Sequence, residues 1–176
     1  HSRFLPAPSG RPPPPVAGPP SGLLNRSGLP GPGIDAFLDR DLAWLAQRGA
    51  RAVVSIAGSS VEDYAKLAAK LRGQKGLAMI EVNISCPNVE DRGQVFACDP
   101  AAASAVVQAV RRNSDKAVPV FAKLSPDVSD IASIARACVG AGADRRSLLN
   151  PVPGLVAAPP PLRPVARGGV GQTHGL

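Results

Sequence analysis

Amide, hydroxyl and thiol side chains are crowded into one short stretch, Ile80–Asn88, which reads Ile-Glu-Val-Asn-Ile-Ser-Cys-Pro-Asn. Its first half alternates β-branched and polar residues, a pattern that predicts a strand. Pro87 lacks a backbone N–H and favours an extended residue before it, so we expect the strand to end near Cys86. Amides can donate and accept hydrogen bonds, and a thiolate can act as a base. The alternative is an ordinary turn, with Asn88 as a turn residue and Cys86 as a small buried side chain.

Four strands, including this one, and the helices between them are expected to position these groups. Each predicted strand is a short run of mostly apolar residues, and each predicted helix repeats apolar residues at helical spacing. Alternating strands and helices form right-handed βαβ units with a parallel sheet, either open or closed into a barrel. In both arrangements ligands bind at the carboxyl ends of the strands. The predicted strands are Ala52–Ala57, Met79–Ser85, Val118–Leu124 and Ser147–Asn150. The predicted helices are Asp35–Arg48, Val61–Arg72, Pro100–Asn113 and a last one that starts at Ser129 or Asp130 and runs to about Gly140.

Two of the predicted helices start at residues that commonly cap a helix. Ser60 precedes the helix that begins at Val61, and Asp63 can complete a capping box with it. Asp99 followed by Pro100 places an N-cap residue before a proline at the first helical position.

Charge and proline divide the chain into a central part and two flanks. The chain has 176 residues and a net charge of +7, yet residues 35–150 hold 15 Lys and Arg against 13 Asp and Glu. The excess positive charge lies in the flanks, and no basic face interleaved with aromatic residues indicates a nucleic-acid partner. Because 16 of the 20 prolines lie in residues 1–34 and 151–176, we expect no regular elements there. We predict a disordered, low-complexity segment at 1–20, a folded domain at 21–150 and an irregular tail after it.

The three cysteines, Cys86, Cys98 and Cys138, indicate free thiols. Their number is odd and no C-x-x-C spacing occurs, so the sequence predicts neither a disulfide framework nor a zinc site or other metal site. Free thiols fit a reducing cytoplasm. No apolar run is long enough to span a membrane, and no signal peptide is visible at His1.

The stretch around Cys86 resembles the active-site strand of dihydroorotate dehydrogenase, the flavin enzyme of pyrimidine synthesis. Family members that use cysteine as a base carry an Asn-x-Ser-Cys-Pro-Asn string there, and further similar strings follow in the right order. The resemblance implies an α/β fold that is part of a (β/α)8 TIM barrel, with the four predicted strands as strands three to six. The similar strings lie at residues 31–35, 53–58, 80–88, 93–96, 99–100, 121–126 and 140–144.

The resemblance also implies a reaction and a set of site residues. The family oxidises dihydroorotate to orotate in de novo UMP biosynthesis, with removal of the C5 proton by a base and hydride transfer from C6 to FMN. Cysteine as the base is typical of the soluble, cytoplasmic class. By this resemblance Cys86 is the base, Asn25, Asn83, Asn88 and Asn150 bind the substrate, and Ser55, Asn83, Lys123 and Leu149 contact FMN, the last through its backbone.

Partners and alternatives follow from the same resemblance. Residues 90–99 look more like the subclass that passes electrons to NAD through a second subunit bearing FAD and an iron–sulfur cluster, with fumarate as the other possible acceptor. Dihydropyrimidine dehydrogenase is a related alternative, although it has His where Asn88 stands.

A complete (β/α)8 barrel typically needs about 250 residues, and strands one, two, seven and eight have no evident counterpart here. We therefore also predict a partial coding segment whose flanks are read out of frame, and an inactive barrel fragment as a further alternative. Open sheet edges would make such a chain marginally stable or oligomeric.

Overall fold

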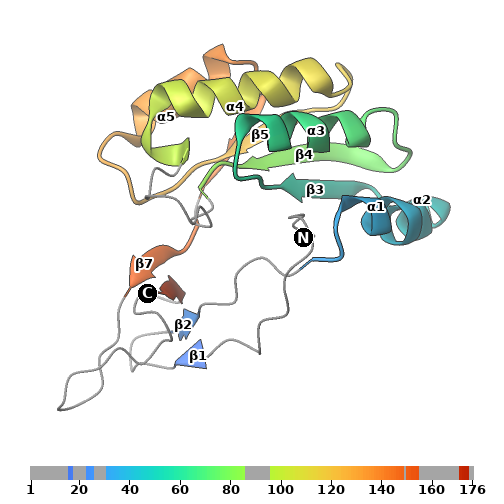
Figure 1. The fold of residues 1–176 in the computed structure, drawn as a ribbon, viewed down its shortest axis with the longest axis horizontal. Coiled ribbons are helices and arrows are strands. Elements are labelled where there is room, and N and C mark those ends of the chain that lie inside the picture. The colour runs from blue at the N-terminus through green and yellow to red at the C-terminus, as the bar shows by residue number, and fades with distance from the viewer. Residues whose placement is uncertain are drawn as a thin grey trace.

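The computed structural model describes residues 16–17, 23–25, 31–85, 96–148, 150–154 and 171–174. Its central layer is a sheet of four parallel strands in the order β3-β4-β5-β6 (Figure 1). The strands are β3 (Ala52–Ile56), β4 (Leu77–Asn83), β5 (Val120–Lys123) and β6 (Arg145–Ser147). This arrangement confirms the predicted alternation of parallel strands and helices.

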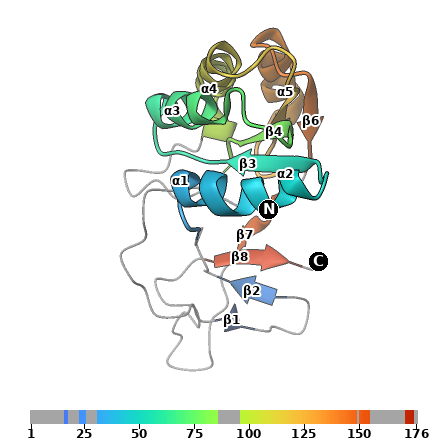
Figure 2. The same ribbon diagram turned by 90° about the vertical axis from the view of Figure 1, so that its right-hand side faces the viewer.

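Three helices cover one face of this sheet, as Figures 1 and 2 show from two directions. They are α3 (Val61–Leu71), α4 (Pro100–Asn113) and α5 (Ile131–Gly140). A further helical segment precedes β3 and a short 3-10 turn precedes α4. These are α1 (Ile34–Ala36), the π-helix η1 (Phe37–Leu42), α2 (Ala43–Gln47) and η2 (Phe96–Cys98). Among the described helices, none is long and apolar enough to cross a membrane.

The helix caps form as the sequence predicts. Ser60 Oγ accepts a hydrogen bond from the backbone N–H of Asp63, and the Asp63 carboxylate accepts one from the backbone N–H of Ser60. This reciprocal pair is a capping box, and it satisfies backbone donors that the first turn of α3 leaves without partners. Asp99 caps α4 without such a reciprocal contact: its carboxylate accepts hydrogen bonds from the backbone N–H groups of Ala101 and Ala102, and Pro100 occupies the first helical position.

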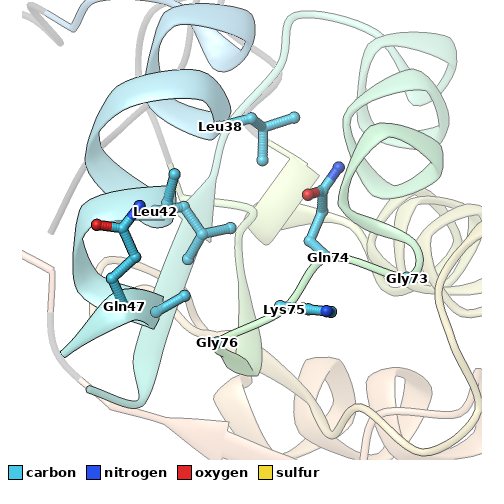
Figure 3. Close-up of a pocket in the computed structure, with 9 residues that line it drawn as sticks. Leu38, Leu42, Gln47, Gly73, Gln74, Lys75 and Gly76 are labelled. Carbon is cyan, nitrogen blue, oxygen red and sulfur yellow. The ribbon is translucent and has the colours of Figure 1, made fainter. Parts of the chain in front are cut away.

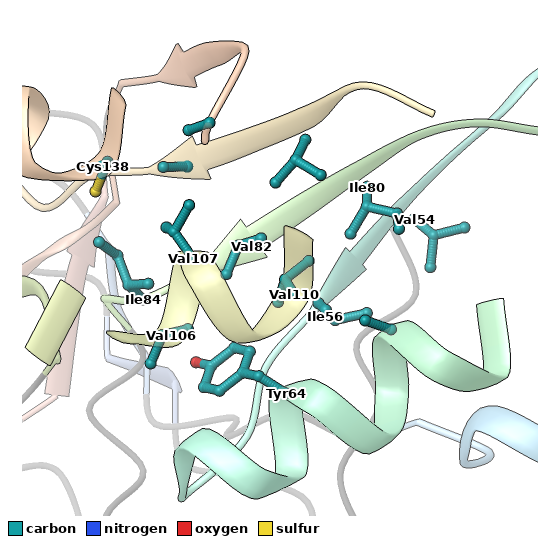
Figure 4. Close-up of a cluster of buried hydrophobic side chains, with 14 of the residues drawn as sticks. Val54, Ile56, Tyr64, Ile80, Val82, Ile84, Val106, Val107, Val110 and Cys138 are labelled. Carbon is teal, nitrogen blue, oxygen red and sulfur yellow. The ribbon is translucent and has the colours of Figure 1, made fainter. Parts of the chain in front are cut away.

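The hydrophobic core lies between the sheet and the helix layer (Figure 4). Alternate residues of β3 and β4 point toward α3 and α4, because successive side chains of a strand face opposite sides of the sheet. Each of the central core residues has at most 1% of its surface exposed, and they are Val54, Ile56, Tyr64, Ile80, Val82, Ile84, Val106, Val107 and Val110. The remaining residues of the strands, which include the polar ones, therefore face away from the helices.

The boundaries of all four strands differ from the predicted ones. β3 ends one residue earlier than predicted, and β5 begins two residues later and ends one residue earlier. β4 begins and ends two residues earlier than predicted, and β6 covers Arg145–Ser147 where Ser147–Asn150 was predicted. Pairing with β5 sets the position of β6, since its register aligns Phe121 with Arg145 and Lys123 with Ser147. The apolar residue Leu148, which favoured the later strand, is 65% exposed.

Short antiparallel strands occur in the two flanks, so the expectation of no regular elements there is wrong for these segments. β1 (Val16–Ala17), β2 (Leu23–Asn25), β7 (Val152–Gly154) and β8 (Gly171–His174) form a second sheet in the order β1-β2-β8-β7. Pro153 is compatible with this sheet because β7 is an edge strand, where a missing N–H is tolerated. The predicted domain boundaries near residues 20 and 150 stay a prediction.

Candidate active site at the carboxyl ends of the strands

Polar side chains form a row across the ends of three neighbouring strands. Asn83, Lys123 and Ser147 are the last residues of β4, β5 and β6, and the register places them side by side. Glu81 lies two residues before Asn83, on the same face of β4, and is in register with Ser55 of β3. Since parallel strands end at the same edge of a sheet, this row occupies the position where ligands bind in such folds.

Glu81 is a buried carboxylate with partners from three other strands. The residue is 6% exposed. Ser55 Oγ donates to Glu81 Oε1 at 2.8 Å, and Ser147 Oγ donates to Glu81 Oε2 at 2.9 Å. Lys123 Nζ lies 3.8 Å from Oε1, with 14% of the lysine side chain exposed. A buried charge is strongly destabilising unless it is paired and hydrogen-bonded, and these contacts meet that need.

Asn83 is fully buried and leaves part of its amide without a partner. Its Oδ1 accepts hydrogen bonds from Ser85 Oγ at 3.3 Å and from Asn150 Nδ2 at 3.0 Å. Among the described residues, Asn83 Nδ2 and Asn150 Oδ1 have no hydrogen-bond partner although both atoms are buried. Burying an unpaired polar atom costs about 1–3 kcal/mol. The two amides, which are hydrogen-bonded to each other, therefore leave one buried donor and one buried acceptor without a partner.

Tyr64 fixes the backbone of Asn83 from the helix side. Its hydroxyl donates to the backbone carbonyl of Asn83 at 2.7 Å, and its ring packs edge-on against Phe96 with 5.8 Å between ring centroids. Tyr64 projects from α3 into the core beside Val106 (Figure 4). Asn83 is thus anchored on both faces of the sheet, which restricts its orientation.

The structure brings together several of the residues predicted for the site. Asn83 and Asn150, which are 67 positions apart in the sequence, are in direct hydrogen-bond contact. Lys123 occupies the same row as Asn83. Ser55 lies on the correct face but donates its hydroxyl proton to Glu81, so that proton is already engaged within the sheet.

Other predicted site residues lie outside the described part of the chain. Cys86, Asn88 and Leu149 are among these, so their predicted roles stay predictions. Asn25 is the last residue of β2, and its side chain also lies outside what the structure describes.

Three residues that contribute to the site were not assigned a role from the sequence: Glu81, Ser147 and Tyr64. A signal existed for Glu81, because strand alternation places a charged residue on the same face as Asn83. Tyr64 lies on an amphipathic helix, where an aromatic residue usually indicates only the core. Its contact with Asn83 depends on the packing of α3 against β4, which the sequence does not reveal.

A separate hollow of about 500 Å³ lies between the helical segment before β3 and the turn that leads into β4 (Figure 3). Gly76, in its wall, immediately precedes the amino end of β4. This hollow is therefore at the opposite end of the strand from Asn83. The other lining residues are Leu38, Leu42, Ala43, Ala46, Gln47, Gly73, Gln74 and Lys75.

Comparison with known protein families shows which family the chain belongs to. The sequence model of the family described as dihydroorotate dehydrogenase matches residues 5–159. This chain belongs to the dihydroorotate dehydrogenase family. The match begins within the proline-rich N-terminal flank, which disagrees with the prediction that this flank is read out of frame.

Relatives within the family are NAD-linked. The chain is 42% identical over 167 residues to the dihydroorotate dehydrogenase B (NAD(+)) catalytic subunit of Citrifermentans bemidjiense, covering 95% of this chain and 54% of that protein. It is 47% identical over 148 residues to the corresponding subunit of Desulforudis audaxviator, covering 84% and 48%. The chain is thus a homologue of this subunit, as the sequence predicts, and spans about half the length of these relatives.

A solved dihydroorotate dehydrogenase has the same fold. The enzyme of Eimeria tenella, in complex with ferulenol, superposes with a TM-score of 0.70 at 16% identity, over 96% of this chain and 53% of that one. This likeness confirms the predicted fold class, part of a dihydroorotate dehydrogenase TIM barrel.

Dihydroorotate dehydrogenases use FMN, and the described residues fit such a group. Asn83 and Lys123 of the row supply a buried amide donor and an ammonium group, and Asn150, in contact with Asn83, supplies a buried amide acceptor. A flavin ring carries both hydrogen-bond donors and acceptors, and its reduced form gains negative charge. The chemistry of Asn83, Asn150 and Lys123 complements these properties.

Proposed function

We propose that this chain carries catalytic and binding residues for the oxidation of dihydroorotate to orotate in pyrimidine biosynthesis, with FMN as the immediate electron acceptor. The observation that carries the proposal is the pair of unpartnered buried amide atoms, Asn83 Nδ2 and Asn150 Oδ1. Their two side chains are hydrogen-bonded to each other, and Asn83 is in register with Lys123. Membership of the family gives the reaction its identity. When bound, FMN supplies an acceptor for the hydride that leaves the substrate.

The proposed substrate contacts follow from the chemistry of the amides. Dihydroorotate carries ring N–H groups, ring carbonyls and a carboxylate. Asn83 Nδ2 would donate to an oxygen of this ligand, and Asn150 Oδ1 would accept from an N–H group. A ligand that leaves either atom unpaired would bind more weakly, so this pair contributes to selectivity. Asn25 and Asn88 complete the proposed set of substrate amides by the family resemblance.

Lys123 and Cys86 have different proposed tasks. The Lys123 ammonium would favour negative charge on the flavin through direct electrostatic attraction, while Ser55 and the backbone of Leu149 would line the same site. Cys86 follows β4 in the sequence, and its thiolate would remove the proton from C5 of the substrate. Removal of this proton leaves an electron pair that forms the new double bond as the hydride departs.

The electrons are proposed to continue to NAD through a partner subunit. The two relatives described above are named NAD(+)-linked catalytic subunits, and this name supports a multi-subunit arrangement. By the family resemblance, the partner would carry FAD and an iron–sulfur cluster. Cytoplasmic location belongs to the same proposal.

An anaerobic reduction assay tests the proposal. The chain is loaded with FMN, freed from excess, and mixed with dihydroorotate, and loss of the visible flavin absorption reports reduction. We expect reduction by dihydroorotate to be much faster than by dihydrouracil. Faster reduction by dihydrouracil would favour a flavin barrel of the dihydropyrimidine dehydrogenase type.

A variant separates the chemistry from binding in the same assay. Cys86→Ala should keep FMN and lose reduction by dihydroorotate by roughly 100-fold or more, the usual contribution of a general base. Equal rates in the variant and the parent chain would remove Cys86 from the mechanism. A chain that retains FMN but is not reduced would behave as the inactive barrel fragment.

A further inference from the structure

We propose that Glu81 is a positioning residue that holds the Lys123 ammonium group at the carboxyl end of the sheet. The inference concerns a residue to which the family resemblance assigned no role. Its significance for catalysis depends on the proposed function, since Lys123 is there the cation beside the flavin. The contact between the two side chains itself is independent of that function.

The first argument is the way in which the Glu81 carboxylate is fixed. Each of its oxygens accepts one serine hydroxyl, Ser55 at 2.8 Å from β3 and Ser147 at 2.9 Å from β6. Two hydrogen bonds from opposite sides define the plane of the carboxylate group. The negative charge is therefore held at one place between β3 and β6, beneath the row of strand ends.

The second argument is the contrast between this anchored group and the side chain of Lys123. A lysine has a flexible stem and would ordinarily extend its ammonium group into water. Here Nζ lies 3.8 Å from Glu81 Oε1, and only 14% of the lysine side chain is exposed. At 3.8 Å the attraction is mainly between charges, with no short hydrogen bond, so Nζ retains donors for a ligand. Low exposure reduces screening by water, which strengthens the attraction relative to a surface pair.

A purely structural role for Glu81 predicts that the position of the Lys123 ammonium group does not depend on the negative charge of Glu81. If the residue served only to connect β3 with β6 through the serines, a neutral Glu81→Gln side chain would still accept one of the hydroxyls. The ammonium group of Lys123 would then be unaffected. If Glu81 holds Lys123, the neutral side chain releases the ammonium group even when the sheet is intact.

The first measurement needs no flavin. The folded chain is treated briefly with an amine-acylating reagent, and the extent of reaction at each lysine is determined by mass spectrometry. In Glu81→Gln we expect Lys123 to react roughly fivefold faster than in the parent chain, as the loss of a buried contact pair implies. The exposed Lys116 provides the internal reference.

A matched control removes a carboxylate from an exposed pair. Glu62→Gln breaks the contact with Lys66 on α3, in which both side chains are largely exposed. This change should leave the reactivity of Lys123 unaltered. Unchanged reactivity of Lys123 in Glu81→Gln, with a folded chain, would overturn the proposal.

The second measurement connects Glu81 to the flavin through Lys123. FMN affinity is compared in the parent chain, Glu81→Gln, Lys123→Met and the double variant. Glu81→Gln should weaken binding by roughly fivefold in the parent chain and by less than twofold when Lys123 is already absent. Equal weakening in both backgrounds would mean a structural role and would contradict the proposal.

The two measurements distinguish failure of the inference from failure of the proposed function. A chain that binds no FMN, yet shows faster acylation of Lys123 in Glu81→Gln, supports the role of Glu81 and refutes the proposed function. If Glu81→Gln does not fold, Ser147→Ala replaces it, because this variant loosens the carboxylate at Oε2 and keeps its charge. Roughly twofold faster acylation of Lys123 is then expected, and no change would overturn the proposal.

Discussion

The hydrogen bond from Tyr64 to the backbone of Asn83 allows a quantitative test of how the helix layer supports the site. The Tyr64→Phe variant removes one hydroxyl group and keeps the aromatic ring. The ring is 1% exposed and packs edge-on against Phe96, so the variant creates no large cavity. The change therefore isolates the 2.7 Å contact with the Asn83 carbonyl.

The expected loss of stability follows from the burial of the acceptor. Asn83 is 0% exposed, so water cannot replace the lost donor without local opening of the structure. Leaving a buried polar group without its partner costs about 1–3 kcal/mol, and we expect the free energy of unfolding to fall by this amount. Because the Asn83 amide belongs to the proposed ligand site, FMN affinity should fall as well.

Urea denaturation followed by circular dichroism provides the assay. The midpoint should move to lower urea concentration with an unchanged slope, which identifies a loss of stability without a change in the denatured state. Val61→Ala is the matched control on the same helix, because Val61 is 36% exposed and its truncation should change stability by about 0.5 kcal/mol or less. A Tyr64→Phe variant as stable as the parent chain would refute the argument that this contact anchors Asn83.

Two further predictions concern ionisable groups. Burial opposes the charge on Asp63, but hydrogen bonds from Ser59 and Ser60 outweigh it and lower the pKa of this carboxyl group. Asp63→Ala should therefore destabilise the chain by about 1 kcal/mol at neutral pH, and the difference should vanish as the pH falls below about 4; a pH-independent difference in urea denaturation would contradict this. Burial raises the pKa of the Cys138 thiol to about 11, while Cys98 is exposed. Iodoacetamide at pH 8 should thus alkylate Cys98 and spare Cys138 in the folded chain. Equal labelling of the two cysteines, measured by mass spectrometry, would contradict this prediction.

Local signals in the sequence predicted the regular part of the fold well. The capping box of Ser60 and Asp63 and the Asp99-Pro100 start of α4 depend on residues within one turn, so a short window contains all the necessary information. The alternation in β4 also separated core positions from the polar face correctly. The position of β6 could not be found in this way, because its pairing with β5 decided it and the apolar Leu148 indicated a later strand.

Long-range contacts account for what the sequence did not reveal about the site. The contact of Asn83 with Asn150 was expected only in the sense that the family resemblance assigned both to the substrate. The Glu81 contacts with Ser55 and Ser147 span 26 and 66 positions and depend on strand order. Serine is common at strand ends for many reasons, so its type alone carries no indication of such a partner.

The visible absorption spectrum of the purified chain, taken after FMN is added and free FMN is removed, tests the central claim most directly. We predict that the parent chain retains FMN at close to one per chain. Asn83→Leu, shown to be folded by circular dichroism, should retain little, because it removes the fully buried amide at the end of β4. A parent chain without flavin, or equal retention by the folded variant, would contradict the assignment of a flavin site to these strand ends.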